Sequence, residues 1–153
     1  MNIAGVDLSS RALDFAVIDI TSGDLRAIHR LELGPTLNES CATIGLEMRY
    51  VIARFELGQV WIEEPRTRFW TAAKALFPLL GAVAAASSPT PSFAMSVPEI
   101  RAELGLAQNR PKAYYQEAAL KLTGVHLSEH AADAFLVGRA ARSVQLRATT
   151  SQD

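Results

Sequence analysis

The stretch Ile3-Ala4-Gly5-Val6-Asp7 opens the chain with a short apolar run that ends in a carboxylate. Two further runs, at 13–20 and 25–33, are rich in β-formers or alternate between apolar and polar side chains, as strands do. The segments between these runs contain serine, glycine and aspartate, which are typical of turns. We therefore predict that the first third of the chain forms an antiparallel meander of three strands.

The rest of the chain alternates between helical and strand patterns. A helical pattern runs from Pro35 and Asn38 to a stop at Gly58, and the apolar run 60–63 is the next strand, which again ends in an acid. Helices are expected at 70–86, 98–104, 112–122 and 129–144, with Ser128 as the cap of the last helix and a short strand at 92–95. The order βββαβαβα predicts an α/β fold of the RNase H-like type. Its sheet would be mixed and five-stranded, with three antiparallel strands and then two parallel ones, flanked by helices.

The bulk composition limits the class of protein. A chain of 153 residues predicts a single RNase H-like domain over 1–147, with a disordered tail at 148–153. The longest nearly apolar stretch, 75–86, is too short to span a bilayer, and no basic segment precedes the first apolar run, so we expect no membrane association and no secretion signal. The single cysteine, Cys41, excludes an intramolecular disulfide and fits a reducing cytoplasm.

Charge is distributed unevenly although the net charge is only −1. Residues 1–65 hold ten acids and five bases, whereas 66–153 hold six acids and ten bases. This asymmetry could place a metal site beside a phosphate-binding surface. Solvated charge with a chance asymmetry would give the same numbers.

Four residues carry the candidate chemistry. A carboxylate buried at the end of an apolar strand costs several kcal/mol unless it is paired or holds a metal, and the sequence has this arrangement at Asp7 and again at Glu63. Either acid alone could equally be a cap or a salt-bridge partner. His130 and Asp133 lie three positions apart and so share one face of the last helix, where small neighbours would let the helix approach a sheet closely.

This set of donors indicates the kind of metal. Three acids and one imidazole suit Mg²⁺, with Mn²⁺ as a substitute, whereas zinc would recruit thiolates or more histidines. Two such ions about 3.5–4 Å apart can activate water and stabilise the leaving oxygen in phosphodiester cleavage. We therefore expect two ions in each active site.

Three motifs resemble those of the RuvC-type Holliday-junction resolvases, including the divergent phage-type members. They are Ala4-Gly5-Val6-Asp7, Trp61-Ile62-Glu63-Glu64 and His130-Ala131-Ala132-Asp133-Ala134, in the family's order and at about its spacing. The resemblance extends to about Ala141. It implies the RNase H-like fold and a catalytic metal site made of Asp7, Glu63, His130 and Asp133.

The resemblance also implies how the protein would act. It implies a homodimer that resolves four-way DNA junctions by symmetric cleavage in recombination and repair, in a bacterial or phage-infected cell. A two-fold dimer would match the two-fold symmetry of a junction. Helix 70–86 is similar to the family's dimer-forming region, although its apolar residues could equally belong to a monomer's core. Lys112 resembles a family lysine near the scissile phosphate; a solvated lysine at a helix start is the alternative.

A further group of residues is a candidate DNA-binding surface. Aromatic residues interleaved with arginines can stack on bases and bind phosphates, and some family members place an aromatic wedge near the end of the second motif. Packing of the rings into the core or a dimer interface is the alternative. The candidates are Arg66, Arg68, Phe69, Trp70, Arg110 and Lys112.

Some features depart from the family, and other functions stay open. Leu8-Ser9-Ser10 follows Asp7 where cellular members have proline and glycine, and Pro65 follows the second motif. These departures affect junction specificity more than nuclease chemistry. A general branched-DNA or flap nuclease and a relative that binds DNA without cutting are therefore alternatives. Actin-like and sugar-kinase ATPases share the core, but the sequence lacks their second glycine-rich phosphate loop.

Overall fold

The computed structural model describes residues 1–65 and 70–150, and among these the side chains of 70–73 are outside the description. Within these ranges the chain forms a mixed sheet of five strands in the order β3-β2-β1-β4-β5. The strands are β1 (Asn2–Leu8), β2 (Ala12–Asp19), β3 (Leu25–Glu32), β4 (Leu57–Glu63) and β5 (Ser92–Met95). The first three pair antiparallel, and β4 and β5 then add in parallel. The predicted fold class is confirmed.

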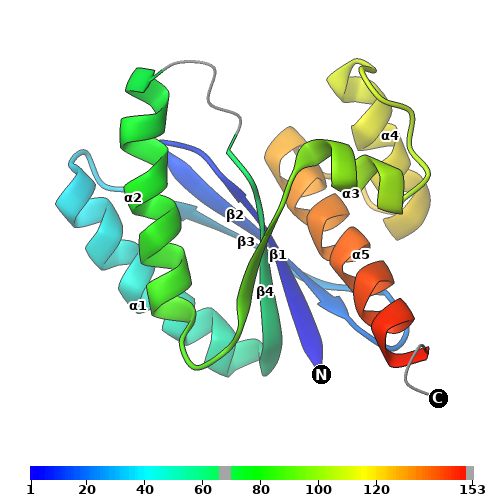
Figure 1. Cartoon of the computed structure of the whole chain (residues 1–153), viewed down its shortest axis with the longest axis horizontal. Helices are drawn as coiled ribbons and strands as arrows, with labels where there is room; N and C mark the ends of the chain where they lie inside the picture. The colour runs from blue at the N-terminus through cyan, green and yellow to red at the C-terminus, as the bar shows by residue number, and fades with distance from the viewer. Residues whose placement is uncertain (66–69, 151–153) are drawn as a thin grey trace.

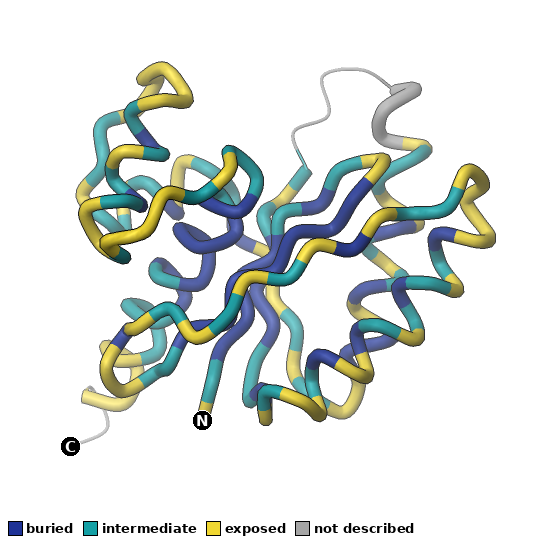
Figure 2. The backbone as a smooth tube through the Cα atoms, turned by 180° about the vertical axis from the view of Figure 1, so that it is seen from behind, coloured by how far each residue is buried: buried dark blue, intermediate teal, exposed yellow. Residues whose placement is uncertain are grey.

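The helices cover both faces of this sheet (Figure 1). They are α1 (Leu37–Phe55), α2 (Trp70–Ser87), α3 (Val97–Glu103), α4 (Lys112–Thr123) and α5 (Glu129–Thr150). One face packs on α1 and α2, and the other packs on α5 with α3 and α4 around it. Buried backbone is concentrated in the central strands and in α5 (Figure 2). In the described part of the chain, no helix has both the length and the apolar character of a membrane span.

Alternation along the strands separates the two cores. On β1, Val6 and Leu8 belong to the core beneath α1 and α2, whereas Ile3 belongs to the core beneath α5. Because side chains alternate between the faces of a strand, Asp7 falls on the α5 side. The same argument applies to β4, where Ile62 faces α1 and α2 while Trp61 faces α5, so Glu63 also falls on the α5 side.

Helix α5 approaches β1 closely because both elements carry glycine at the crossing. A Cβ added to Gly5 would lie 2.1 Å from the carbonyl oxygen of Ala134 and 2.3 Å from the backbone nitrogen of Gly138. A Cβ on Gly138 would in turn lie 2.6 Å from Cδ1 of Ile18. Any larger side chain at either position would push the helix away from the sheet. The expectation that small residues bring this helix close to the sheet is confirmed.

Two element boundaries differ from the sequence prediction. Helix α1 ends at Phe55, with Glu56 in the left-handed conformation as its C-cap, so Gly58 lies inside β4 and does not stop the helix. Helix α5 continues to Thr150, beyond the predicted end near Val144. Residues 148–150, expected to be disordered, are therefore helical, and 151–153 lie outside the described residues. Ser128 behaves as predicted, because its Oγ accepts a hydrogen bond from the Ala131 backbone N–H at 3.3 Å.

Candidate active site

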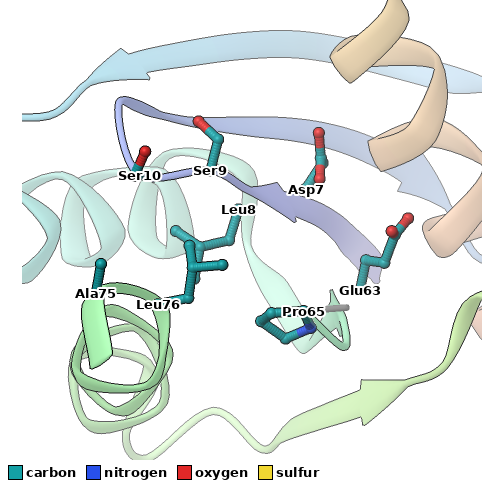
Figure 3. Close-up of a pocket in the computed structure, with 8 residues that line it drawn as sticks. All are labelled: Asp7, Leu8, Ser9, Ser10, Glu63, Pro65, Ala75 and Leu76. Carbon is teal, nitrogen blue, oxygen red and sulfur yellow. The ribbon is translucent and has the colours of Figure 1, made fainter. Parts of the chain in front are cut away.

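Two of the four candidate residues meet where the parallel strands β1 and β4 end. The register pairs Val6 with Ile62, so the next residues, Asp7 and Glu63, emerge side by side at the carboxyl ends of their strands. Their carboxylates lie on the same side of the strands (Figure 3). Glu64, the second acid of the motif, is exposed and follows the end of the strand. The structure thus brings Asp7 and Glu63 together, as predicted.

The first turn of α5 contributes the other two residues. The His130 ring lies 2.7 Å from Asp7, between Nδ1 and Oδ2. We assign the hydrogen to Nδ1, since the ionised carboxylate can only accept. This tautomer leaves the lone pair of Nε2 available to a cation. Asp133 follows one turn later on the same helix.

Three of the four residues, Asp7, Glu63 and Asp133, line two neighbouring cavities, and His130 contacts Asp7 beside them. The larger, of about 400 Å³, is bounded by the end of β1, the β1–β2 turn and α2, and it includes Asp7 and Glu63 (Figure 3). The smaller, of about 190 Å³, is lined by Glu63, Val97, Arg101, Lys112 and Asp133. Because Glu63 lines both cavities, it lies between Asp7 on one side and Asp133 on the other.

Burial makes this site electrostatically unfavourable for carboxylates. Burial, together with the negative charge of Asp7, raises the pKa of Asp133 to about 6. Burial also raises the pKa of Asp7, although the hydrogen bond from His130 opposes that shift. Two acids that lack full compensation in a concave site are typical of functional positions.

Two cations lie beside the acids. Lys112, at the start of α4, lines the smaller cavity, lowers the pKa of Asp133 through its charge and forms an ion pair with Glu129. Arg101, on α3, lines the same cavity and stacks over Tyr115, with its guanidinium carbon 4.1 Å from the ring centroid. In the sequence, a single arginine on a short helix carries no signal beyond that of a solvated surface charge.

Asp7, Glu63, His130 and Asp133 are of the residue types that bind a divalent cation. Their side chains do not converge on a single point. Carboxylate oxygens with one imidazole nitrogen are ligands for Mg²⁺ or Mn²⁺, and a cation would offset the burial of Asp7 and Asp133. Among the residues that the structure describes, no three His, Cys, Asp or Glu side chains lie close enough together to hold an ion. Binding would require Asp7, Glu63, His130 and Asp133 to approach one another more closely.

Comparison with solved structures places this arrangement in a known fold. Thermus thermophilus RuvC in complex with Holliday junction substrate matches with a TM-score of 0.81 at 21% identity, covering 95% of this chain and 96% of that chain. A second structure of Thermus thermophilus RuvC matches with a TM-score of 0.82 at 20% identity, covering 96% of this chain and 97% of that chain. This chain has the RuvC fold. The predicted RNase H-like fold is therefore confirmed over almost the whole of both chains.

More distant resolvases share the RuvC fold. The yeast mitochondrial Holliday junction resolvase Ydc2 matches with a TM-score of 0.62 at 10% identity, covering 98% of this chain and 83% of that chain. The fowlpox virus resolvase, in a complex with Holliday junction DNA, matches with a TM-score of 0.59 at 12% identity, covering 95% and 99%. No family model matches the sequence, and a comparison with curated protein sequences gives no match.

The candidate DNA-binding residues are only partly described. Arg66, Arg68 and Phe69 lie outside the described residues, and Trp70 begins α2 with a side chain that is not described. Arg110 is exposed in the loop before α4, where its backbone N–H donates to Tyr115 Oη at 3.1 Å.

Two other arginines, Arg139 and Arg142, have hydrogen-bond partners inside the fold. Arg139 donates from Nη1 to the carbonyl oxygen of Gly23 at 2.7 Å. Arg142 donates to the carbonyl oxygens of Ile20 and Thr21 at 2.7 and 2.6 Å. Both side chains therefore fix the β2–β3 turn against α5.

Sequence reasoning missed Asp14 as part of this region. The antiparallel register places Asp14 on β2 directly opposite Asp7, and its side chain is 4% exposed. Arg30 on β3 donates from Nη1 to Asp14 Oδ2 at 2.8 Å. The signal was an acid inside the otherwise apolar sequence Leu13-Asp14-Phe15-Ala16.

Proposed function

We propose that this protein is a metal-dependent endonuclease that resolves four-way DNA junctions by symmetric phosphodiester cleavage. One observation carries the proposal: Asp7, Glu63 and Asp133, predicted from three separate motifs, line two adjoining cavities in a chain with the RuvC fold, and His130 lies within hydrogen-bond distance of Asp7. The junction-bound resolvases of the same fold support four-way DNA as the substrate.

Asp7, Glu63, Asp133 and the Nε2 atom of His130 would hold Mg²⁺, or Mn²⁺ in its place, with two ions in each site. Such ions supply Lewis-acid activation of water and neutralise charge on a phosphodiester during hydrolysis. Asp7 orients His130 through the hydrogen bond to Nδ1. Lys112 and Arg101, which line the smaller cavity, would hold a phosphate oxygen and balance its developing negative charge.

We propose a homodimer, with α2 as its contact. The exposed face of α2 carries Phe77, Pro78, Gly81, Ala84 and Ala85, which recur at helical spacing. Phe77 is 52% exposed, and residues 75–87 contain no charged side chain. A second copy that packs on this apolar face would place two active sites about a two-fold axis, as a four-way junction requires.

The substrate test uses three labelled DNAs: a synthetic four-way junction, a flap and a linear duplex. Each is incubated with Mg²⁺, with Mn²⁺ and with chelator. We expect paired symmetric nicks in the junction alone, dependent on metal. Equal cutting of the flap would make the protein a general branched-DNA nuclease, the first alternative from the sequence. Metal-independent binding without any cutting would make it a non-cutting relative.

The adjacent acids Glu63 and Glu64 provide a matched pair of variants for this test. Glu63 lines both cavities, whereas Glu64 lines neither and is exposed. We expect Glu63→Gln to abolish cleavage and Glu64→Gln to leave it within about twofold. Equal loss in both variants would contradict the assignment of the site.

The dimer has its own test, by light scattering of the eluting protein. We expect Phe77→Glu to yield monomers at micromolar concentration, because the new charge would be buried at the contact. Leu46→Glu is the control, since Leu46 is 74% exposed on α1 and so lies outside the proposed contact helix. A monomeric wild-type chain would contradict the dimer without affecting the active site.

A further inference from the structure

A row of three charged side chains leads from Asp7 to the edge of the sheet. Asp7 on β1 is opposite Asp14 on β2, and Asp14 is opposite Arg30 on β3. Directly opposed residues of antiparallel strands point to the same face, with Cβ atoms about 4.5–5.5 Å apart. All three side chains therefore lie on the α5 side of the sheet, next to the candidate active site.

The presence of two acids at directly opposed positions of the sheet requires a physical explanation. Like charges opposite each other destabilise a sheet, and an apolar residue at position 14 would continue the buried strand at no such cost. The structure gives each acid its own partner, with His130 Nδ1 at 2.7 Å from Asp7 and Arg30 Nη1 at 2.8 Å from Asp14. Arg30 lies on the strand beyond Asp14, and His130 comes from helix α5, so each carboxylate has a separate partner.

Arg30 does not depend on Asp14 for a counter-charge. Its Nε also donates to Glu32 Oε1 at 2.6 Å, on the exposed edge strand. Arg30 is thus shared between two carboxylates, and the group of Asp14, Arg30 and Glu32 carries a net negative charge. Asp14 is the member of this group that lies beside Asp7, and it lines neither cavity.

We propose that Asp14 is a positioning residue of the metal site. The negative charge of Asp14, which Arg30 partly neutralises, strengthens the binding of a divalent cation by Asp7. The same charge keeps the Asp7 carboxylate directed toward His130. The inference rests on the proposed metal-dependent function, and it adds an acid that binds no ion itself. It predicts that the two members of the pair influence metal affinity in opposite directions.

The test measures Mn²⁺ binding to the full chain without DNA, from the electron paramagnetic resonance signal of free Mn²⁺ at constant pH and ionic strength. We expect Asp14→Asn to weaken binding about three- to tenfold, because a negative charge near the ion is lost while the amide oxygen can still accept from Arg30. We expect Arg30→Gln to strengthen binding by a similar factor, because it leaves the charge of Asp14 uncompensated. Glu32→Gln is the control, with an expected change of less than about twofold.

Opposite shifts separate this role from a purely structural one. Both variants lose an ion pair, so both should lower the free energy of unfolding, and damage to the fold would weaken Mn²⁺ binding in both. Weaker binding in both variants, or unchanged binding in both, would overturn the inference and leave a structural ion pair. A wild-type chain that binds no more Mn²⁺ than Asp7→Asn would instead refute the proposed metal site itself.

Discussion

Asp14 is buried and Asp133 is half-buried on the α5 side of the sheet, and their surroundings affect their negative charges in opposite ways. Asp14 has the guanidinium of Arg30 at 2.8 Å. Asp133 has a pKa of about 6 because burial and the charge of Asp7 disfavour its ionised form. The negative charge of Asp14 is therefore balanced within the fold, whereas the negative charge of Asp133 lowers the stability of the fold. Such a cost is expected where a residue is kept for ligand binding or catalysis.

The largest expected effect is the loss of DNA cleavage in the Asp7→Asn variant. This variant should lose at least about a thousandfold in cleavage rate while it binds junction DNA as well as wild type or better, because removal of a negative charge weakens metal capture but no phosphate contact. Single-turnover cleavage and a DNA-binding titration measure the two quantities. Asp14→Asn is the matched variant at the paired acid, and at saturating metal it should cut within about tenfold of wild type. An Asp7→Asn chain that fails to fold would make Asp7 a structural residue.

Lys112→Ala should produce the next largest effect. Lys112 is a cation beside Asp133 and lines the same cavity, so its loss should slow cleavage by about ten- to a hundredfold and weaken DNA binding much less. Glu129→Gln, which removes the ion-pair partner of Lys112, is the comparison and should leave cleavage nearly unchanged. Losses of equal size in cleavage and in binding would make Lys112 an ordinary phosphate contact.

Stability should distinguish the two buried acids directly. The pKa of Asp133 is raised from 3.8 to about 6, so its ionised form destabilises the metal-free fold at pH 7 by roughly 1–3 kcal/mol. Asp133→Asn should therefore raise the free energy of unfolding, measured by urea denaturation without metal. Asp14→Asn should lower it by about 1–2 kcal/mol, because Arg30 loses its buried partner. A change of the same sign in the free energy of unfolding of both variants would contradict the contrast between Asp14 and Asp133.

The smallest expected effect is a pH dependence of the metal-free protein. The folded-state pKa of Asp133 lies above its unfolded value, so protonation favours the folded state. The stabilisation is complete below about pH 4 and is lost as the pH rises through about 6. The wild type should thus be more stable at pH 5.5 than at pH 7, and the raised pKa of Asp7 acts in the same direction.

Asp133→Asn should flatten this dependence and serves as its control. Asp19, Glu99, Glu103 and Glu117 do not interfere in this window, because their lowered pKa values make their contributions to stability fall only at lower pH. A wild-type chain whose stability is flat or falls between pH 7 and pH 5.5 would contradict the raised pKa of Asp133.

The elements of the fold could be predicted because their periodicities are strong. Strand β5, Ser92–Met95, and the starts of α2 and α4 fall at the residues where the sequence predicts them. The end of α1 could not be predicted, because Glu56 adopts a left-handed conformation that glycine or asparagine usually occupies. The length of α5 was underestimated because its last turns have a polar composition that also suits a disordered tail.

The site could be predicted as a set of residues but only partly as a geometry. Asp7, Glu63 and His130 were found because an acid at the end of an apolar strand and a histidine among small residues are unusual. Asp14 was missed although the hairpin itself gives its position, since the turn at 9–11 places residue 14 opposite residue 7. Side-chain rotations decide how closely the four candidate ligands approach one another, and no sequence pattern specifies them.

The most direct test of the central claim is a crystal structure of the protein soaked in Mn²⁺, with anomalous scattering used to locate the ion. We predict one or two anomalous peaks among Asp7, Glu63, His130 and Asp133, with the carboxylate oxygens about 2.0–2.3 Å from the metal and no peak at Asp14. Peaks at other acids only, or none at a concentration that supports cleavage, would contradict the claim that these buried carboxylates are kept to hold a metal.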